Sequence, residues 1–237
     1  MAARIIISYD GTDNDRDALA LGRMLADARA DISLAYVRHT VESEQRREEL
    51  EHDDAERLLA SGAQWLERPN ARRHVVLSGS TGEGLGQLAA QEHADIVVFG
   101  SEYHTAPGHV EPGTSAQRLL ESGPVGIAIA PARLRDHAGA HVASIGVVAE
   151  GDDAAAQVTA SSLAAALGAH VAGPDAEHVD LLVIGSRAEA PEGRVLISAA
   201  SEYRLQTATV PVLVVPRSGG VRFATLGSTH SPTPTAA

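Results

Sequence analysis

The chain carries the same short pattern twice, an aspartate followed by an apolar run that ends in Gly-Ser. The first copy is residues 95–101 (DIVVFGS) and the second is residues 180–186 (DLLVIGS). Each copy continues through a polar loop to another apolar run that ends in proline. The glycine precedes this proline by the same 31 residues in both copies (131 − 100 and 216 − 185). Internal repetition of this kind makes the repeat the structural unit of the chain.

The segments between the repeated motifs predict a fold class. Continuous apolar runs near residues 5–9, 32–37, 74–77, 96–100 and 125–130 alternate with segments of helical periodicity. Buried strands that alternate with helices indicate a doubly wound α/β fold with a parallel sheet. With flavodoxin-like winding, the five strands take the order 3-2-1-4-5, and Asp10 and Gly100 lie on opposite sides of one crevice where the order reverses.

The second half of the chain is a shortened version of the first. Residues 144–149 match the first strand, which aligns Glu150 with Asp10. The interval from this acidic residue to the repeated glycine falls from 90 residues (100 − 10) to 35 (185 − 150). About 55 residues are therefore missing, roughly the long charged helix and the third strand, and so small a module depends on its neighbour. We predict a complete repeat (1–131), a linker (132–141), a smaller degenerate repeat (142–216) and a disordered tail (217–237).

Composition excludes several classes of function. The formal net charge of −12 disfavours nucleic acid or an anionic membrane as a partner. All 19 basic residues are arginine and no cysteine occurs, which excludes lysine and cysteine chemistry. No apolar run approaches the roughly 18 residues of a membrane span, and the first residues do not resemble a signal peptide. Because no catalytic signature occurs either, we predict a cytoplasmic protein that is not an enzyme.

The motifs resemble the universal stress protein family in its tandem form, over about residues 4–216. In the first repeat the similarity lies in residues 5–12 (IIISYDGT) and 94–101 (ADIVVFGS). In the second it lies in residues 185–187 (GSR), 198–203 (SAASEY) and 211–216 (PVLVVP). The resemblance implies a regulatory role in stress adaptation through an unknown protein partner. It also implies an internal pseudo-dimer in which residues 125–130 lie beside residues 210–215, and it leaves dimerisation of whole chains open.

The same resemblance implies an adenine-nucleotide site in the first repeat. Family members that bind ATP carry G-x2-G-x9-G-[ST] after strand four, where close backbone approach and a helix N-terminus receive the phosphates. This spacing is kept here, but its second glycine is replaced by tyrosine. The resemblance also implies that the acidic residue after strand one and a backbone position in strand two hold the adenosine part of the nucleotide. The candidate ligand-binding residues are therefore Asp10, Val37, Gly100, Tyr103, Gly113, Thr114 and Ser115.

Departures from the family pattern weaken the predicted site. If the position of Tyr103 needs a left-handed backbone, the substitution costs about 1–2 kcal/mol, and the ring occupies phosphate space. Residues 101–112 offer only His104 and His109 as cations. We therefore expect at most weak binding of ATP or AMP, with Mg²⁺ accompanying ATP. In the second repeat we expect none, because its template positions are Gly185, Ala188, Ser198 and Ala199.

Each candidate residue also has a simpler interpretation. Asp10 contacts a ligand or caps the first helix, and residues 113–115 bind phosphate or begin a helix. Tyr103 stacks on a small adenine ligand or plugs the crevice, and in the plugged case the protein is a ligand-free interaction or scaffold protein. His104 and His109 lack the spacing of a metal site, so we expect no metal. Residues 80–86 (STGEGLG) follow a strand but fail G-x-G-x-x-G, which favours a helix start.

Overall fold

The computed structural model describes residues 2–39, 45–137, 139, 141–173, 176 and 178–224. The elements of the first half are β1 (Arg4–Ser8), α1 (Asp13–Asp27), β2 (Asp31–His39), α2 (Gln45–Trp65), β3 (Arg72–Ser78), α3 (Thr81–Glu92), β4 (Ile96–Gly100), α4 (Thr114–Ser122) and β5 (Gly126–Ala130). Those that follow are η1 (Leu134–His137), β6 (Ser144–Val148), α5 (Ala155–Leu167), β7 (His170–Ala172), β8 (Leu181–Ile184), α6 (Ala199–Gln206) and β9 (Val212–Val214). The Ser80 hydroxyl caps α3 by accepting the Glu83 N–H at 3.3 Å, so residues 80–86 form a helix start.

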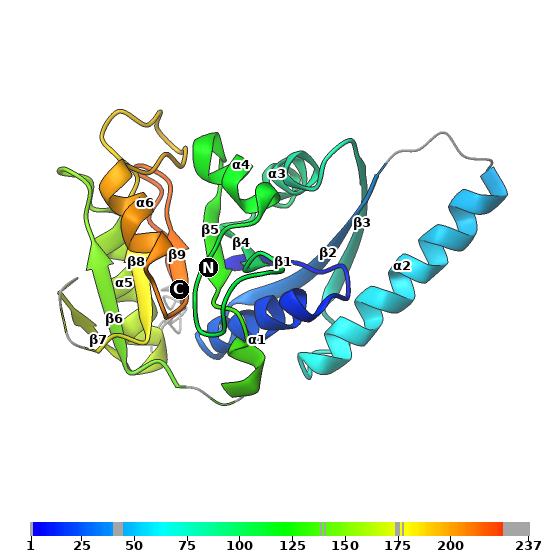
Figure 1. The fold of residues 1–237 in the computed structure, drawn as a ribbon, viewed down its shortest axis with the longest axis horizontal. Helices are drawn as coiled ribbons and strands as arrows, with labels where there is room; N and C mark the ends of the chain where they lie inside the picture. Colours follow the sequence, from blue (N-terminus) through cyan, green and yellow to red (C-terminus); the bar gives the residue numbers. More distant parts are fainter. Residues whose placement is uncertain are drawn as a thin grey trace, which may run out of the picture.

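The nine strands of the described residues form one sheet in the order β3-β2-β1-β4-β5-β9-β8-β6-β7 (Figure 1). The first five strands have the predicted order 3-2-1-4-5. The last four repeat that winding without a third strand, since β7, β6, β8 and β9 correspond to β2, β1, β4 and β5. Every pair is parallel except β5 and β9, where Ile127 lies opposite Val214 and Ile129 opposite Val212. The predicted pairing of the fifth strands is confirmed.

Two hydrophobic layers cover the sheet and extend through both repeats. Successive strand residues point to opposite faces, so Ile5 and Ile7 of β1 belong to the cluster under α1, α2 and α5, whereas Ile6 belongs to the cluster under α3, α4 and α6. Leu163 of α5 joins the first cluster and Leu205 of α6 joins the second. Each cluster is therefore built from both repeats, and the truncated repeat shares its core with the complete one.

The segment between the repeats is fixed to α1 by a buried carboxylate. Asp17 is 2% exposed and accepts the backbone N–H groups of Arg133 (2.8 Å) and Arg135 (2.9 Å). The Arg135 guanidinium also donates to Asp17 at 2.8 Å. The described residues of the predicted linker are thus packed against α1. Their hydrogen bonds satisfy the Asp17 carboxylate, which would be costly to bury without partners.

The prediction of a disordered tail over residues 217–237 is wrong for residues 217–224. Val221 and Phe223 are buried against α5, and their N–H groups donate to the hydroxyls of Thr159 (2.8 Å) and Ser162 (2.7 Å). The alternating apolar residues of this short segment supply a further buried contact that its Gly- and Pro-rich surroundings concealed. Residues 225–237 of the predicted tail lie outside the described residues.

Candidate functional site

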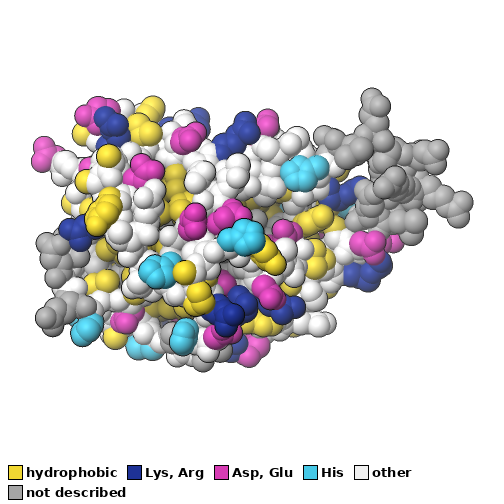
Figure 2. Space-filling model, viewed as in Figure 1, with side chains coloured by type: hydrophobic (Ala, Val, Ile, Leu, Met, Phe, Trp, Pro, Cys, Tyr) yellow, Lys and Arg dark blue, Asp and Glu magenta, His cyan; other side chains and the backbone are white. Residues whose placement is uncertain are grey.

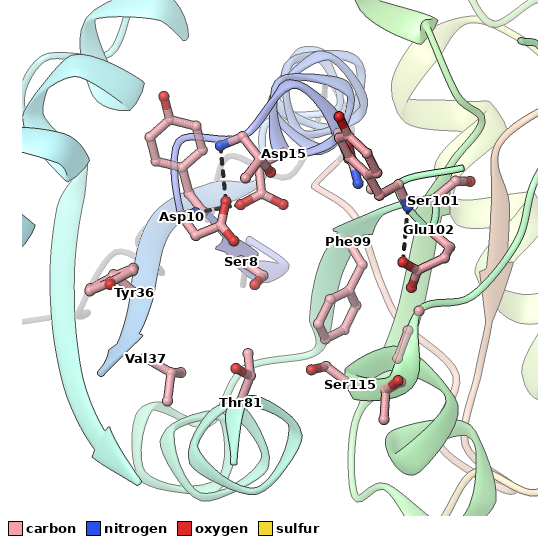
Figure 3. Close-up of a pocket in the computed structure, with 18 of the residues that line it drawn as sticks. Ser8, Asp10, Asp15, Tyr36, Val37, Thr81, Phe99, Ser101, Glu102 and Ser115 are labelled. Carbon is pink, nitrogen blue, oxygen red and sulfur yellow. Dashed lines mark hydrogen bonds between the residues drawn. The ribbon is translucent and has the colours of Figure 1, made fainter. Parts of the chain in front are cut away.

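A cavity of about 490 Å³ opens at the carboxyl ends of β1 and β4, where the strand order reverses (Figure 3). Ligands of doubly wound folds bind at this position. One wall comes from the loop after β1 and from β2, and the other comes from the loop after β4 and the first turn of α4. The structure brings all seven candidate residues to this one cavity: Asp10, Val37, Gly100, Tyr103, Gly113, Thr114 and Ser115.

The loop after β1 holds two carboxyl groups together. The Asp10 N–H donates to the Asp15 carboxyl group, and the Asp10 carboxylate accepts the Thr12 N–H at 2.9 Å. Thr12, and not Asp10, is the N-cap residue of α1. Asp10 therefore stabilises the turn before the helix, and its side chain remains exposed at the cavity wall.

The two carboxyl groups have opposite pKa shifts. Burial, the hydrogen bond to Asp10 and the negative charge of Asp10 raise the pKa of Asp15 to about 8. Partial burial acts to raise the pKa of Asp10 as well, but hydrogen bonds from Asp15 and Thr12 outweigh it and leave that pKa below its usual value. At neutral pH the pair therefore holds one proton on Asp15 and one negative charge on Asp10.

Gly100 is required by packing between β4 and α1. A Cβ on Gly100 would lie 2.1 Å from the carbonyl oxygen of Asn14 and 2.6 Å from its carbonyl carbon, and backbone atoms cannot yield easily. The sequence-based explanation, close approach to a ribose or phosphate, is therefore not needed for this glycine. Because Gly100 has no side chain, the first turn of α1 can pack against the end of β4 and line the cavity.

Tyr103 lines the cavity without filling it. Its side chain is 69% exposed, and its ring meets the edge of the His104 ring at a centroid distance of 4.8 Å. Tyr103 is not among the residues with positive φ, so the strain that we considered for this position does not arise. The cavity remains open beside an exposed aromatic ring, which disfavours the plugged interpretation.

The first turn of α4 faces the cavity without a capping side chain. Gly113 is the N-cap residue and makes no side-chain cap, while Thr114 and Ser115 follow it along the wall. The free N–H groups of such a turn attract an acceptor. A Glu102 carboxylate oxygen lies 2.9 Å from the point where a Cβ on Gly113 would be, and the other accepts the Tyr103 N–H at 3.1 Å.

The serine of each repeated Gly-Ser motif has a structural role that the sequence did not indicate. Ser101 donates to the carbonyl of Ala130 at 2.7 Å and accepts the N–H of Glu111 at 3.1 Å. In the second repeat Ser186 donates to Val215 at 2.7 Å and accepts the N–H of Leu196 at 3.2 Å. Each serine joins the end of the fourth strand to the end of the fifth and to the loop between them.

The repeated aspartates are structural as well. Asp95 accepts the N–H of Arg4 at 2.8 Å, and Asp180 accepts the N–H groups of Ala143 and Ser144, both at 2.9 Å. Each carboxylate therefore ties the start of the fourth strand to the start of the first. The repeated motif itself could have revealed the structural roles of its aspartate and serine. The second copy keeps both residues although it has lost the later glycines of the nucleotide-binding pattern.

The corresponding region of the second repeat is arranged differently. Glu150 aligns with Asp10, and its carboxylate accepts the hydroxyl groups of Ser198 and Ser201 at the start of α6. Ser198 also caps α6 by accepting the Ser201 N–H at 3.1 Å. A carboxylate of the protein itself is thus held by serine hydroxyl groups at the positive end of α6.

Two features are absent from the described residues, a cluster of metal ligands and a membrane-spanning helix. In the described part of the chain, no group of three or more His, Asp or Glu side chains is placed to hold a metal ion. The helices of that same part include none long and apolar enough to cross a membrane. On the face shown in Figure 2, arginine side chains are scattered among acidic ones instead of forming one basic patch.

The winding and the crevice define a doubly wound, flavodoxin-like α/β protein. A model of the universal stress protein family matches residues 1–131 and 169–216. Because these segments make up more than half of the sequence, the chain belongs to the universal stress protein family. A search of the curated proteins found no match.

Solved structures share the fold over nearly the whole chain. A universal stress protein from Archaeoglobus fulgidus DSM 4304 is 16% identical, and the alignment covers 90% of this chain and 98% of that one at a TM-score of 0.59. A functionally unknown protein from Pseudomonas aeruginosa PAO1 is 12% identical, with 92% of this chain and 93% of that one covered at a TM-score of 0.57. At these identities the similarity concerns the fold alone.

Proposed function

We propose that the protein is a regulator in cytoplasmic stress adaptation whose first crevice binds an adenine nucleotide weakly and whose second crevice binds none. The observation that carries this proposal is the convergence of the seven candidate residues on one cavity of about 490 Å³, a size that suits a small ligand. Tyr36, Val37 and Phe99 offer apolar surface to a base. The exposed Asp10 carboxylate offers an acceptor to ribose hydroxyl groups.

Weak binding follows from the charges around the cavity. Among the described residues that line it, none is an arginine, and His39 is the one side chain able to become a cation. The carboxylates of Asp10 and Glu102 line it as well, next to the protonated Asp15. Phosphate groups would therefore depend on the N–H groups of α4 and on Mg²⁺ carried with the nucleotide. We infer a regulator and not an enzyme, in which occupancy of the crevice changes the affinity for a protein partner.

Isothermal titration calorimetry with ATP, ADP, AMP and cyclic AMP tests the proposal. We expect the parent to bind at least one of these ligands, and Asp10→Asn to weaken that binding about tenfold, because the variant lacks the charged acceptor for ribose hydroxyls. Asp152→Asn, an exposed substitution in the matching loop of the second repeat, is the control and should bind as the parent does. Phosphate release from ATP should not exceed that of a buffer blank.

A ligand-free scaffold makes the opposite prediction for Tyr103. If the ring blocks the crevice, the parent binds none of the four ligands and Tyr103→Gly gains binding. Because the Tyr103 side chain is 69% exposed, we expect Tyr103→Gly to change ligand affinity by less than about threefold. Absence of binding in both proteins would contradict an adenine-nucleotide site altogether.

A further inference from the structure

The two ends of the first crevice differ in chemistry. At one end, aromatic and aliphatic side chains lie beside Asp10. At the other end, Glu102 lies beside the first turn of α4, with one carboxylate oxygen 2.9 Å from the Cβ position of Gly113. Figure 3 shows Asp10 and Glu102 on opposite sides of the cavity. The end beside Asp10 offers apolar surface, and the end beside Gly113 already holds the Glu102 carboxylate.

Local contacts keep the Glu102 carboxylate at this place. One oxygen accepts the Tyr103 N–H at 3.1 Å. The backbone of Glu102 is held on both sides, because its N–H donates to the Glu111 carbonyl at 2.8 Å and its carbonyl accepts the Thr105 N–H at 3.0 Å. A phosphate that approached Gly113 would meet this negative charge with no arginine nearby in the described lining.

We propose that Glu102 determines the ligand class of the crevice by selecting an uncharged adenine nucleoside over nucleotides that carry phosphate. This inference rests on the proposed adenine site and narrows it. The free N–H groups at the start of α4 then serve neutral acceptors. Each added phosphate weakens binding through repulsion by Glu102.

The experiment compares adenosine, AMP, ADP and ATP by calorimetry on the full chain, without Mg²⁺ and at low salt. For the parent we expect affinity to fall at least tenfold from adenosine to ATP. Glu102→Gln should raise ATP affinity about tenfold and leave adenosine affinity unchanged, because the amide keeps the size of the side chain and removes its charge. Glu121→Gln, an exposed change on the last turn of α4, matches the charge change away from the crevice and should behave as the parent.

Salt gives a readout that does not depend on any variant. Screening weakens repulsion, so ATP affinity of the parent should rise with NaCl while adenosine affinity stays constant. ATP binding as tight as adenosine binding in the parent would overturn the inference and leave the adenine site standing. Equal gains in ATP affinity in the two glutamine variants would overturn it too, because net charge would then be the cause. If adenosine and all three nucleotides fail to bind, the proposed function itself fails.

Discussion

In the first repeat the acidic residue after the first strand, Asp10, is exposed at the wall of an open cavity, whereas in the second repeat its counterpart Glu150 accepts two serine hydroxyls at the start of α6. The two residues differ by one methylene group. The longer side chain reaches the two serine hydroxyls at the start of α6, so a carboxylate of the protein itself lies near the positive end of that helix. One fold can thus leave the N–H groups of a helix N-terminus open to a ligand or satisfy them with its own side chains. The choice depends on few residues.

The largest difference between the repeats should appear at their matching glycines. A Cβ on Gly100 would lie 2.1 Å from a backbone oxygen of Asn14, whereas a Cβ on Gly185 would meet nothing closer than 3.5 Å. We expect Gly100→Ala to lower the free energy of unfolding by about 3 kcal/mol through overpacking. Gly185→Ala should change it by less than about 1 kcal/mol. Urea denaturation followed by circular dichroism measures both, and equal losses would show that the close approach of α1 is not specific to the first repeat.

The acidic residues themselves provide the next comparison. Glu150→Ala removes the acceptor of Ser198 and Ser201, and Ser201 is fully buried. We expect a loss of about 2 kcal/mol in the free energy of unfolding, the cost of leaving buried donors unsatisfied. Asp10→Ala should cost less than about 0.5 kcal/mol because its side chain is exposed. Urea denaturation of the two variants measures both losses. A larger loss for Asp10→Ala than for Glu150→Ala would contradict the stabilising role given to Glu150 at the start of α6.

A third pair should show no difference. Ser101 and Ser186 are 3% and 0% exposed, and each donates at 2.7 Å to the carbonyl at the end of its fifth strand. Replacement of either by alanine should lower the free energy of unfolding by about 1 kcal/mol. A thermal melt of the two variants tests this equality. A loss confined to one serine would mean that the repeats do not share this connection.

Much of the fold was predictable because it follows from patterns that repeat along the chain. Continuous apolar runs that alternate with helical segments predicted the strands and their winding, and the duplicated motif predicted two repeats. The resemblance to the family predicted the junction between β5 and β9. All seven candidate residues face one cavity because strand ends in a doubly wound sheet converge at the reversal of strand order.

The remaining features depend on contacts between loops that the sequence does not place together. The bond from Glu150 to Ser198 spans 48 residues, and the approach of Asn14 to Gly100 joins a helix start to a strand end. Asp15 was missed although the acidic run of residues 10–15 contains a signal. Aspartates confined to one tight turn cannot all ionise without mutual repulsion, so one of them is expected to keep its proton.

A further comparison concerns that proton, which has no counterpart in the second repeat because Asp15 aligns with Ala155. The pKa of Asp15 is raised from 3.8 to about 8, so between these pH values the folded chain holds a proton that the unfolded chain has lost. The contribution of Asp15 to the free energy of unfolding therefore falls as pH rises from about 4 to 8 and is constant above that. The lowered pKa of Asp10 acts only below its usual value, outside this window.

Asp15→Asn separates the proton from the hydrogen bonds. The asparagine oxygen can accept the Asp10 N–H. Its amide can donate to the Asp10 carboxylate, as the protonated acid does, but it has no proton to lose. Relative to the parent, the variant should gain stability as pH rises from about 4 to 8, and the two should differ least near pH 4. Asp152→Asn, the exposed control in the second repeat, should follow the parent across the range. Urea denaturation at each pH provides the profile. Parallel curves for Asp15→Asn and the parent would mean that Asp15 is ionised in the folded protein, and that the first crevice carries its negative charge in addition to those of Asp10 and Glu102.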